Sequence, residues 1–214
     1  MSSSASEIDA DLVPASPSIS DVSITEHLDA IAPRHRGRVV SCSGERWEMN
    51  HLEPFAFRID PGLGFEIIVV VHFSSHCFTR SLKWDGRPIA RIPAGELFND
   101  GQEIRVLCEF RHSLSIEYLP RLIRELPRRA IRFARDLSQN FITVELIEGK
   151  DQAPAQHYVV FFEVSRDPKR RRRLLLKVQS AYVKEPFEPR LTKGRRVSFS
   201  TLLKATFMRQ TLKS

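Results

Sequence analysis

The chain has 214 residues but only three cysteines and nine glycines. Three cysteines, Cys42, Cys77 and Cys108, are too few for a disulfide scaffold, so the composition predicts a reducing compartment, the cytoplasm. No uncharged apolar run approaches the ~18 residues of a membrane-spanning helix, and no basic stretch before an apolar core marks a secretory signal. We therefore expect a cytoplasmic protein without a membrane span.

The signatures of several common enzyme classes are missing as well. The sequence contains no Walker loop, no Gly-x-Gly-x-x-Gly, no Gly-x-Ser-x-Gly and no His-Glu-x-x-His. With so few glycines, a loop that cradles phosphates through its backbone is not expected. These absences disfavour a nucleotide-driven motor, a dehydrogenase and a standard hydrolase.

Charge is distributed in blocks. The whole chain carries a net charge of +7 and has a pI near 9.7. Residues 1–33 carry a net −6, residues 34–164 a net +1 and residues 165–214 a net +12. The high pI therefore belongs to the last 50 residues, and a block of this kind attracts polyanions.

The first 33 residues are predicted to form a disordered acidic tail. They contain eight serines, three prolines and six acidic residues, with few apolar side chains to offset the entropy of ordering. Within them, Ser23-Ile24-Thr25-Glu26 is typical of a capping box at the start of a short helix. One hypothesis is that this acidic segment docks on the basic carboxyl end as an internal mimic of nucleic acid.

The rest of the chain predicts an α+β fold, with an antiparallel sheet and helices packed on one face. Residues 34–112 are rich in strand patterns, including 55–59, an apolar run at 65–73 and a hairpin around Asp85-Gly86. Residues 113–214 predict a helix at 113–126, four strands in a meander and a basic helix near 200–212. Whether the two halves share one sheet is left open.

A cluster of histidines and cysteines is a candidate metal site. Zinc binds such nitrogen and sulfur donors, so a structural zinc is one hypothesis, although the short Cys-x2-4-Cys spacing is absent. The alternative is that the cysteines simply pack in the core. No other cofactor is expected. The candidate ligands are His72, His76, Cys77, Cys108 and His112.

The last predicted hairpin offers a candidate catalytic group. If its turn closes around Pro168-Lys169, His157 lies opposite Ser180, and Tyr182 follows on the same face. A histidine acting as general base beside basic side chains would suit cleavage of RNA. The alternative is that Ser180 and Tyr182 only complete a strand, because a slip of one residue moves His157 to the other face.

The basic block itself predicts contact with nucleic acid. Five consecutive cations lie at the hairpin tip, and Phe187, Arg190 and Phe199 could stack on bases. An anionic membrane surface or an acidic protein would be attracted by the same charge. The candidate binding residues are Lys169, Arg170, Arg171, Arg172, Arg173, Lys193, Arg195, Arg196, Lys204 and Arg209.

Two short strings carry a resemblance to known proteins. His76-Cys77-Phe78-Thr79-Arg80 and Val178-Gln179-Ser180-Ala181-Tyr182-Val183 resemble a set of uncharacterised bacterial and mobile-element proteins. More loosely, the helix, the meander and the strand-final Ser-Ala-Tyr look like ribonuclease toxins of the barnase, EndoU, colicin and RelE type. That resemblance implies metal-independent RNA cleavage by His157, Ser180 and Tyr182 with a basic neighbour, Lys177 or Arg173.

The sequence as a whole predicts a nucleic-acid-binding protein, with RNA favoured over DNA and a ribonuclease activity of toxin type as a further hypothesis. The alternative is a non-enzymatic interaction protein whose basic face binds an acidic protein partner. The sequence does not indicate an oligomeric state.

Overall fold

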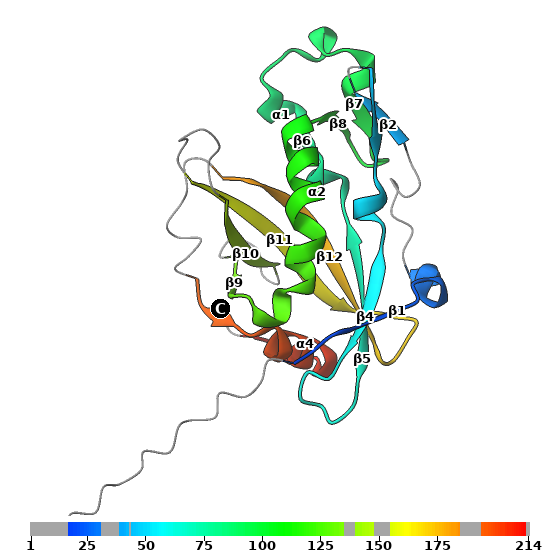
Figure 1. Ribbon diagram of the computed structural model, residues 1–214, viewed down its shortest axis with the longest axis vertical. Helices are drawn as coiled ribbons and strands as arrows, with labels where there is room; N and C mark the ends of the chain where they lie inside the picture. Colours follow the sequence, from blue (N-terminus) through cyan, green and yellow to red (C-terminus); the bar gives the residue numbers. More distant parts are fainter. Residues whose placement is uncertain are drawn as a thin grey trace, which may run out of the picture.

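The structure is a computed structural model that describes residues 17–30, 39–42, 44–134, 140–147, 155–184 and 194–212. The largest sheet has eight strands in the order β1-β4-β5-β12-β11-β10-β9-β13. Helix α2 packs on this sheet (Figure 1). The α+β fold is therefore confirmed. The strands are β1 Ser20–Val22, β4 Phe55–Ile59, β5 Ile67–Phe73, β9 Ile131–Phe133, β10 Asn140–Ile147, β11 Gln156–Arg166, β12 Arg173–Val183 and β13 Arg196–Val197.

The two halves of the chain share this sheet. The four strands β9 to β12 form the expected antiparallel meander. β12 then pairs in parallel with β5, in a register that runs from Arg173 opposite Ile68 to Val178 opposite Phe73. β5 is a nearly continuous β-branched run because it lies in the interior of the sheet, between β4 and β12.

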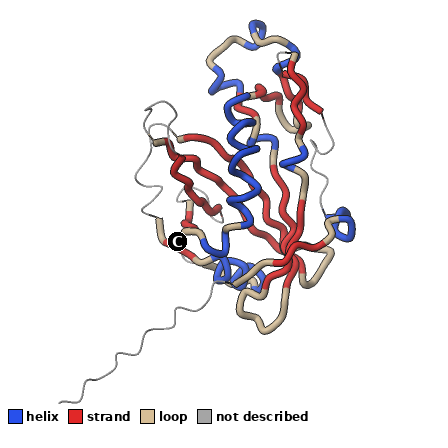
Figure 2. The backbone as a smooth tube through the Cα atoms, viewed as in Figure 1, coloured by secondary structure: helices blue, strands red, loops and turns tan. Residues whose placement is uncertain are grey.

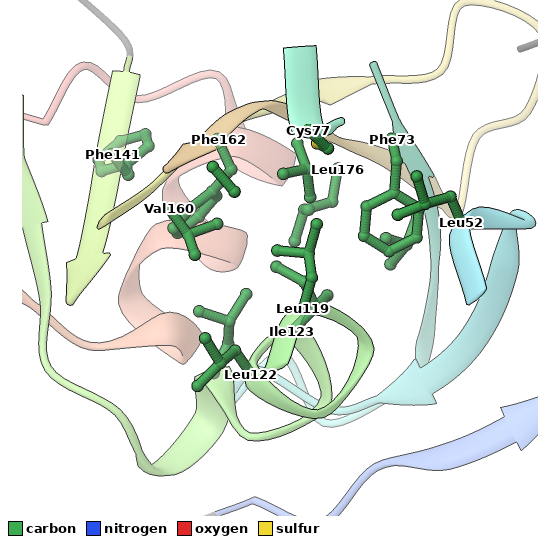
Figure 3. Packing of buried hydrophobic residues seen from close by; sticks show 14 of the residues in the cluster. Leu52, Phe73, Cys77, Leu119, Leu122, Ile123, Phe141, Val160, Phe162 and Leu176 are labelled. Carbon is green, nitrogen blue, oxygen red and sulfur yellow. The ribbon is translucent and has the colours of Figure 1, made fainter. Parts of the chain in front are cut away.

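Two helices cover one face of the sheet. Figure 2 shows the longer one, α2 (Glu109–Arg124), running lengthwise over the strands. Figure 3 shows Leu119, Leu122 and Ile123 of α2 in the core, where Val160 and Leu176 of the sheet also lie. Helix α4 (Phe199–Met208) buries Phe199, Leu202 and Leu203 in the same core, so both helices stabilise one hydrophobic layer.

Pro120 lies inside α2. A proline in a helix leaves the carbonyl four residues earlier without its usual donor. That carbonyl belongs to Ile116, a residue that is 52% exposed, so water can reach this position and donate the missing hydrogen bond. The helix continues through Pro120 at this exposed position.

Smaller elements extend from one end of the main sheet. β2 (Val39–Cys42) pairs with β3 (Glu45–Glu48), and a second small sheet has the order β6-β8-β7. The expected hairpin at Asp85-Gly86 is wrong, because Gly86 (φ 78°) ends a helical turn instead of joining two strands. The remaining elements are β6 Thr79–Ser81, α1 Leu82–Asp85, β7 Leu97–Asn99, β8 Ile104–Leu107 and the 3-10 turns η1 Thr25–Ala30, η2 Asn50–Leu52, η3 Ser75–Cys77, η4 Ile89–Arg91, η5 Ala94–Glu96 and η6 Leu126–Arg128.

Part of the predicted acidic tail belongs to the fold. β1 pairs with β4, and the predicted short helix is the 3-10 turn η1. The expectation of disorder over residues 1–33 therefore extends too far, since residues 17–30 pack on the body. Residues 1–16 and 31–33 lie outside the described residues. Among the described helices, none is long and apolar enough to cross a membrane.

Candidate nucleic-acid interface

The turn between β11 and β12 is built around a buried aspartate. Asp167 accepts hydrogen bonds from the backbone N–H of Lys169 (2.7 Å) and from Nε of Arg173 (2.5 Å). Arg173 is 2% exposed and also donates to Nδ1 of His27 in η1 (3.1 Å). Arg173 therefore supports the turn from inside, contrary to its expected place on the binding surface. Lys169, Arg170, Arg171 and Arg172 remain exposed at the tip.

Three segments that are distant in the sequence meet at this end of the sheet. The backbone N–H of Ile68, in β5, donates to the carbonyl of Arg172, which joins the hairpin turn to the start of β5. Nζ of Lys204, in α4, donates to the carbonyl of Gly62 in the loop between β4 and β5 (2.9 Å). The hairpin turn, this loop and α4 therefore form one surface.

Two arginines of the surface rest on aromatic rings. The rings of Phe65 and Phe207 meet edge to face, with centroids 5.7 Å apart. The guanidinium of Arg172 lies 4.7 Å from the Phe65 centroid, and that of Arg166 lies 5.6 Å from the Phe207 centroid. Cation–π contacts of this kind hold a guanidinium in place while leaving its N–H groups able to bind an anion.

Helix α4 links this tip to a second basic group. Thr201, Lys204 and Met208 form its exposed stripe, and ten residues of α-helix span about 15 Å. At its amino end lies a hollow of about 190 Å³ lined by Phe133, Arg195, Arg196, Val197, Ser198, Thr201 and Leu212. The name "basic surface" is used below for Arg166, Lys169, Arg170, Arg171, Arg172, Arg195, Arg196, Lys204 and Arg209, all of which are described residues.

Four cations of the basic surface have no carboxylate partner among the described residues. Arg171, Arg172, Arg196 and Lys204 form no ion pair with any carboxylate in the part of the chain that the structure describes. Burial, with repulsion from Arg196, lowers the pKa of the Arg132 guanidinium, and two further arginines, Arg195 and Arg196, line the hollow. Exposed carboxylates do occur nearby, on Asp60 and Glu66 in the β4–β5 loop. The cations nevertheless outnumber them by a wide margin.

Several predicted contacts fall elsewhere. Phe199 is 1% exposed in the core and cannot stack on a base, whereas Lys193, Phe187 and Arg190 lie outside the described residues. The sequence reading missed Phe65 and Arg166. Asp60-Pro61-Gly62 is typical of a turn before Phe65, but only the tertiary contact with Phe207 brings that ring beside α4.

The expected alignment of the catalytic group is wrong. Ser180 lies opposite Phe161, and Tyr182 lies opposite Val159. His157 is four residues from Phe161 on β11, so about 13 Å of strand separates His157 from the position opposite Ser180. The turn closes between Asp167 and Arg173 instead of around Pro168-Lys169, and a bulge adds one residue to β12.

The other side chains of that group have separate contacts. Tyr182 stacks on Phe161 (5.7 Å), and the guanidinium of Arg111 lies 4.8 Å from its ring. Lys177 lies 3.9 Å from the carboxylate of Glu163. His157 and Ser180 are therefore not positioned to act on one phosphate, and the register gives no geometric support to RNA cleavage.

The five predicted metal ligands do not assemble into one site. Cys77 is fully buried, and this burial raises the pKa of its thiol to about 12. His112 stacks on Trp47 with centroids 4.3 Å apart, Cys108 precedes α2, and His72 lies within β5. Within the described residues, the histidine, cysteine and carboxylate donors that come together are His76, Asp100 and Glu103.

Comparison with known proteins then assigns a family. The model of the YjaZ family matches residues 39–207. The chain belongs to the YjaZ family. The matched range includes the hairpin turn, α2 and α4 as far as Phe207, but not β1 and η1. No curated protein and no solved structure matches the chain. Membership of the YjaZ family gives no support to the likeness to mobile-element proteins or ribonuclease toxins.

Proposed function

We propose that this protein binds single-stranded nucleic acid, RNA in preference to DNA, along the basic surface. The observation that carries the proposal is the meeting of the hairpin turn, the β4–β5 loop and α4 at one end of the sheet. The hairpin turn and α4 carry exposed cations, and two arginines are held on the rings of Phe65 and Phe207. A flexible polyanion could follow α4 from the hollow at Arg196 to the hairpin tip.

The expected mode of binding combines phosphate contacts with stacking. Arginine and lysine side chains would neutralise phosphates, which supplies affinity without reading the sequence. Unpaired bases would stack beside Phe65 and Phe207 or on the arginine planes, as single-strand binders commonly do. Because His157 and Ser180 lie apart, we propose binding without cleavage.

The test compares two triple variants with equal loss of charge. Arg171→Ala/Arg196→Ala/Lys204→Ala removes exposed cations of the basic surface, and Arg46→Ala/Lys83→Ala/Arg91→Ala removes exposed cations elsewhere. Affinity for a labelled 12-nucleotide RNA is measured by fluorescence anisotropy from 50 to 200 mM salt. If six to ten phosphates are contacted, the wild-type affinity should fall by roughly 300- to 16,000-fold over this range, because the salt slope for single strands is about −0.7 per phosphate.

The first variant should weaken binding and reduce the slope of log K against log salt by about 2, while the second should behave as wild type. Phe65→Leu should weaken binding of single strands by roughly 5- to 150-fold and leave duplex binding unchanged.

The proposal fails if both triple variants lose affinity equally. It also fails if polyglutamate of the same charge binds as tightly as RNA, because this would indicate an acidic protein partner. Shortening of the RNA by the wild-type protein would contradict binding without cleavage.

A further inference from the structure

A second group of polar side chains lies away from the basic surface. It occupies the turn between β7 and β8, at the end of the molecule opposite α4 (Figure 1). His76 comes from η3, and Asp100 and Glu103 come from the turn. Their donor atoms all lie within 4.8 Å of one another, and Nε2 of His76 is 3.3 Å from Oε1 of Glu103.

The carboxylate of Asp100 is held in place by neighbours. Asp100 is 8% exposed, and its Oδ1 accepts hydrogen bonds from the backbone N–H of Gln102 (2.8 Å) and Glu103 (2.9 Å). Its Oδ2 accepts from the hydroxyl of Ser75 (2.8 Å), the residue before His76. Ser75 thereby links the two segments that supply the donors, so their geometry is fixed before any ion binds.

The donor set suits a transition-metal ion. One imidazole nitrogen and two carboxylates lie within 4.8 Å of one another, and zinc binds such nitrogen and oxygen ligands.

Arg105 limits which cation is favoured. Its Nη1 pairs with Oε1 of Glu103, and its Nε donates to the hydroxyl of Thr79 (2.7 Å). This arginine offsets part of the negative charge, so a hard ion that relies on carboxylates gains little. An ion that also forms a strong bond to imidazole nitrogen is favoured, and Zn²⁺ is such an ion.

We propose that His76, Asp100 and Glu103 bind a divalent transition-metal ion, with Zn²⁺ as the best match. Three protein ligands leave one tetrahedral position for water. η3 follows β5 of the main sheet, whereas the turn belongs to the small β6-β8-β7 sheet. The ion would therefore join the small sheet to the main one.

Isothermal titration of the untagged full chain with Zn²⁺ tests the proposal. We expect one ion per chain and at least ~100-fold weaker binding by His76→Ala, with roughly tenfold weaker binding by Ser75→Ala, which releases Asp100. His157→Ala removes a histidine from another part of the sheet and should bind as wild type. Zn²⁺ at about 100 times its dissociation constant should raise the unfolding midpoint of wild type by roughly 5–10 °C, but not that of His76→Ala.

Three results would overturn the metal site. They are the absence of one-to-one binding, an unchanged affinity in His76→Ala, and equal competition by Mg²⁺, which would mean that the imidazole is not a ligand. The unfolding midpoint of each metal-free variant is measured alongside, and His76→Gln replaces any variant that does not fold. RNA binding should be the same with and without chelator, so the two proposals are tested independently.

Discussion

Arg173 differs from the four cations before it because its side chain is buried. Five consecutive cations begin at Lys169, yet the last of them is 2% exposed and pairs with Asp167, which is itself 5% exposed. Arg173 is the first residue of β12, so the start of the strand carries it under the turn. A buried charge is tolerated only when it is paired and hydrogen-bonded, and Asp167 and His27 provide these contacts.

The buried hydroxyl of Tyr158 allows a test of how an unsatisfied polar group affects the free energy of unfolding. Its side chain is fully buried, and its hydroxyl has no hydrogen-bond partner within the described residues. Burial raises the pKa of this phenol well above 10, so it stays neutral. Because an unsatisfied buried hydroxyl costs free energy, Tyr158→Phe should leave the free energy of unfolding unchanged or raise it by up to about 1 kcal/mol.

Urea unfolding measures the effect of Tyr158→Phe, and Tyr182→Phe, at a partly exposed ring, serves as the control and should change stability by less than about 0.5 kcal/mol. A loss of more than 1 kcal/mol in Tyr158→Phe would show that its hydroxyl has a stabilising partner.

Strand pairing explains why the candidate catalytic group fails to assemble. The sequence located both strands and the turn between them, but the register depends on the Asp167–Arg173 closure and on a bulge near Phe161. A bulge leaves the alternation of side chains on either side looking regular, so periodicity alone does not reveal it. The pairing also explains why Ser180 and Tyr182 face partners other than those expected.

Two glycines give a matched prediction about the edge strand β13. A Cβ on Gly194 would lie 2.8 Å from the carbonyl oxygen of Phe133, whereas a Cβ on Gly95 would meet nothing within 4 Å. Gly194→Ala should therefore push β13 away from β9 and lower the free energy of unfolding by about 1–3 kcal/mol. Gly95→Ala should stay within about 0.5 kcal/mol of wild type.

Chemical denaturation measures both glycine variants. Because Arg195 and Arg196 follow Gly194, its variant should also bind RNA more weakly than Gly95→Ala does. Equal stability of the two variants would mean that the backbone at Gly194 can move away at little cost.

Strands from the two halves of the chain lie side by side in one sheet. β12, from the carboxyl half, lies between β11 of its own half and β5 of the other. The basic surface is assembled in the same way, since Phe65 comes from the first half and α4 from the second. No cut near residue 112 would leave either the core or the basic surface complete.

The fragment 113–214 should therefore fail to fold alone. Without β5, the backbone edge of β12 would be unpaired and the core would lose the apolar side chains of β4 and β5. We expect no cooperative thermal transition by circular dichroism, while the full chain shows one. A cooperative transition in the fragment would show that the meander is an independent domain.

Local pattern was enough to predict the fold class, the strands of the meander, the apolar run of β5 and the positions of both long helices. These features follow from side-chain periodicity and from capping and turn residues, which act over a few positions. The parallel joining of β5 to β12, the burial of Arg173 and the grouping of His76 with Asp100 and Glu103 could not be read in this way. Each depends on contacts between segments far apart in the chain, and those contacts form only when the hydrophobic layer packs.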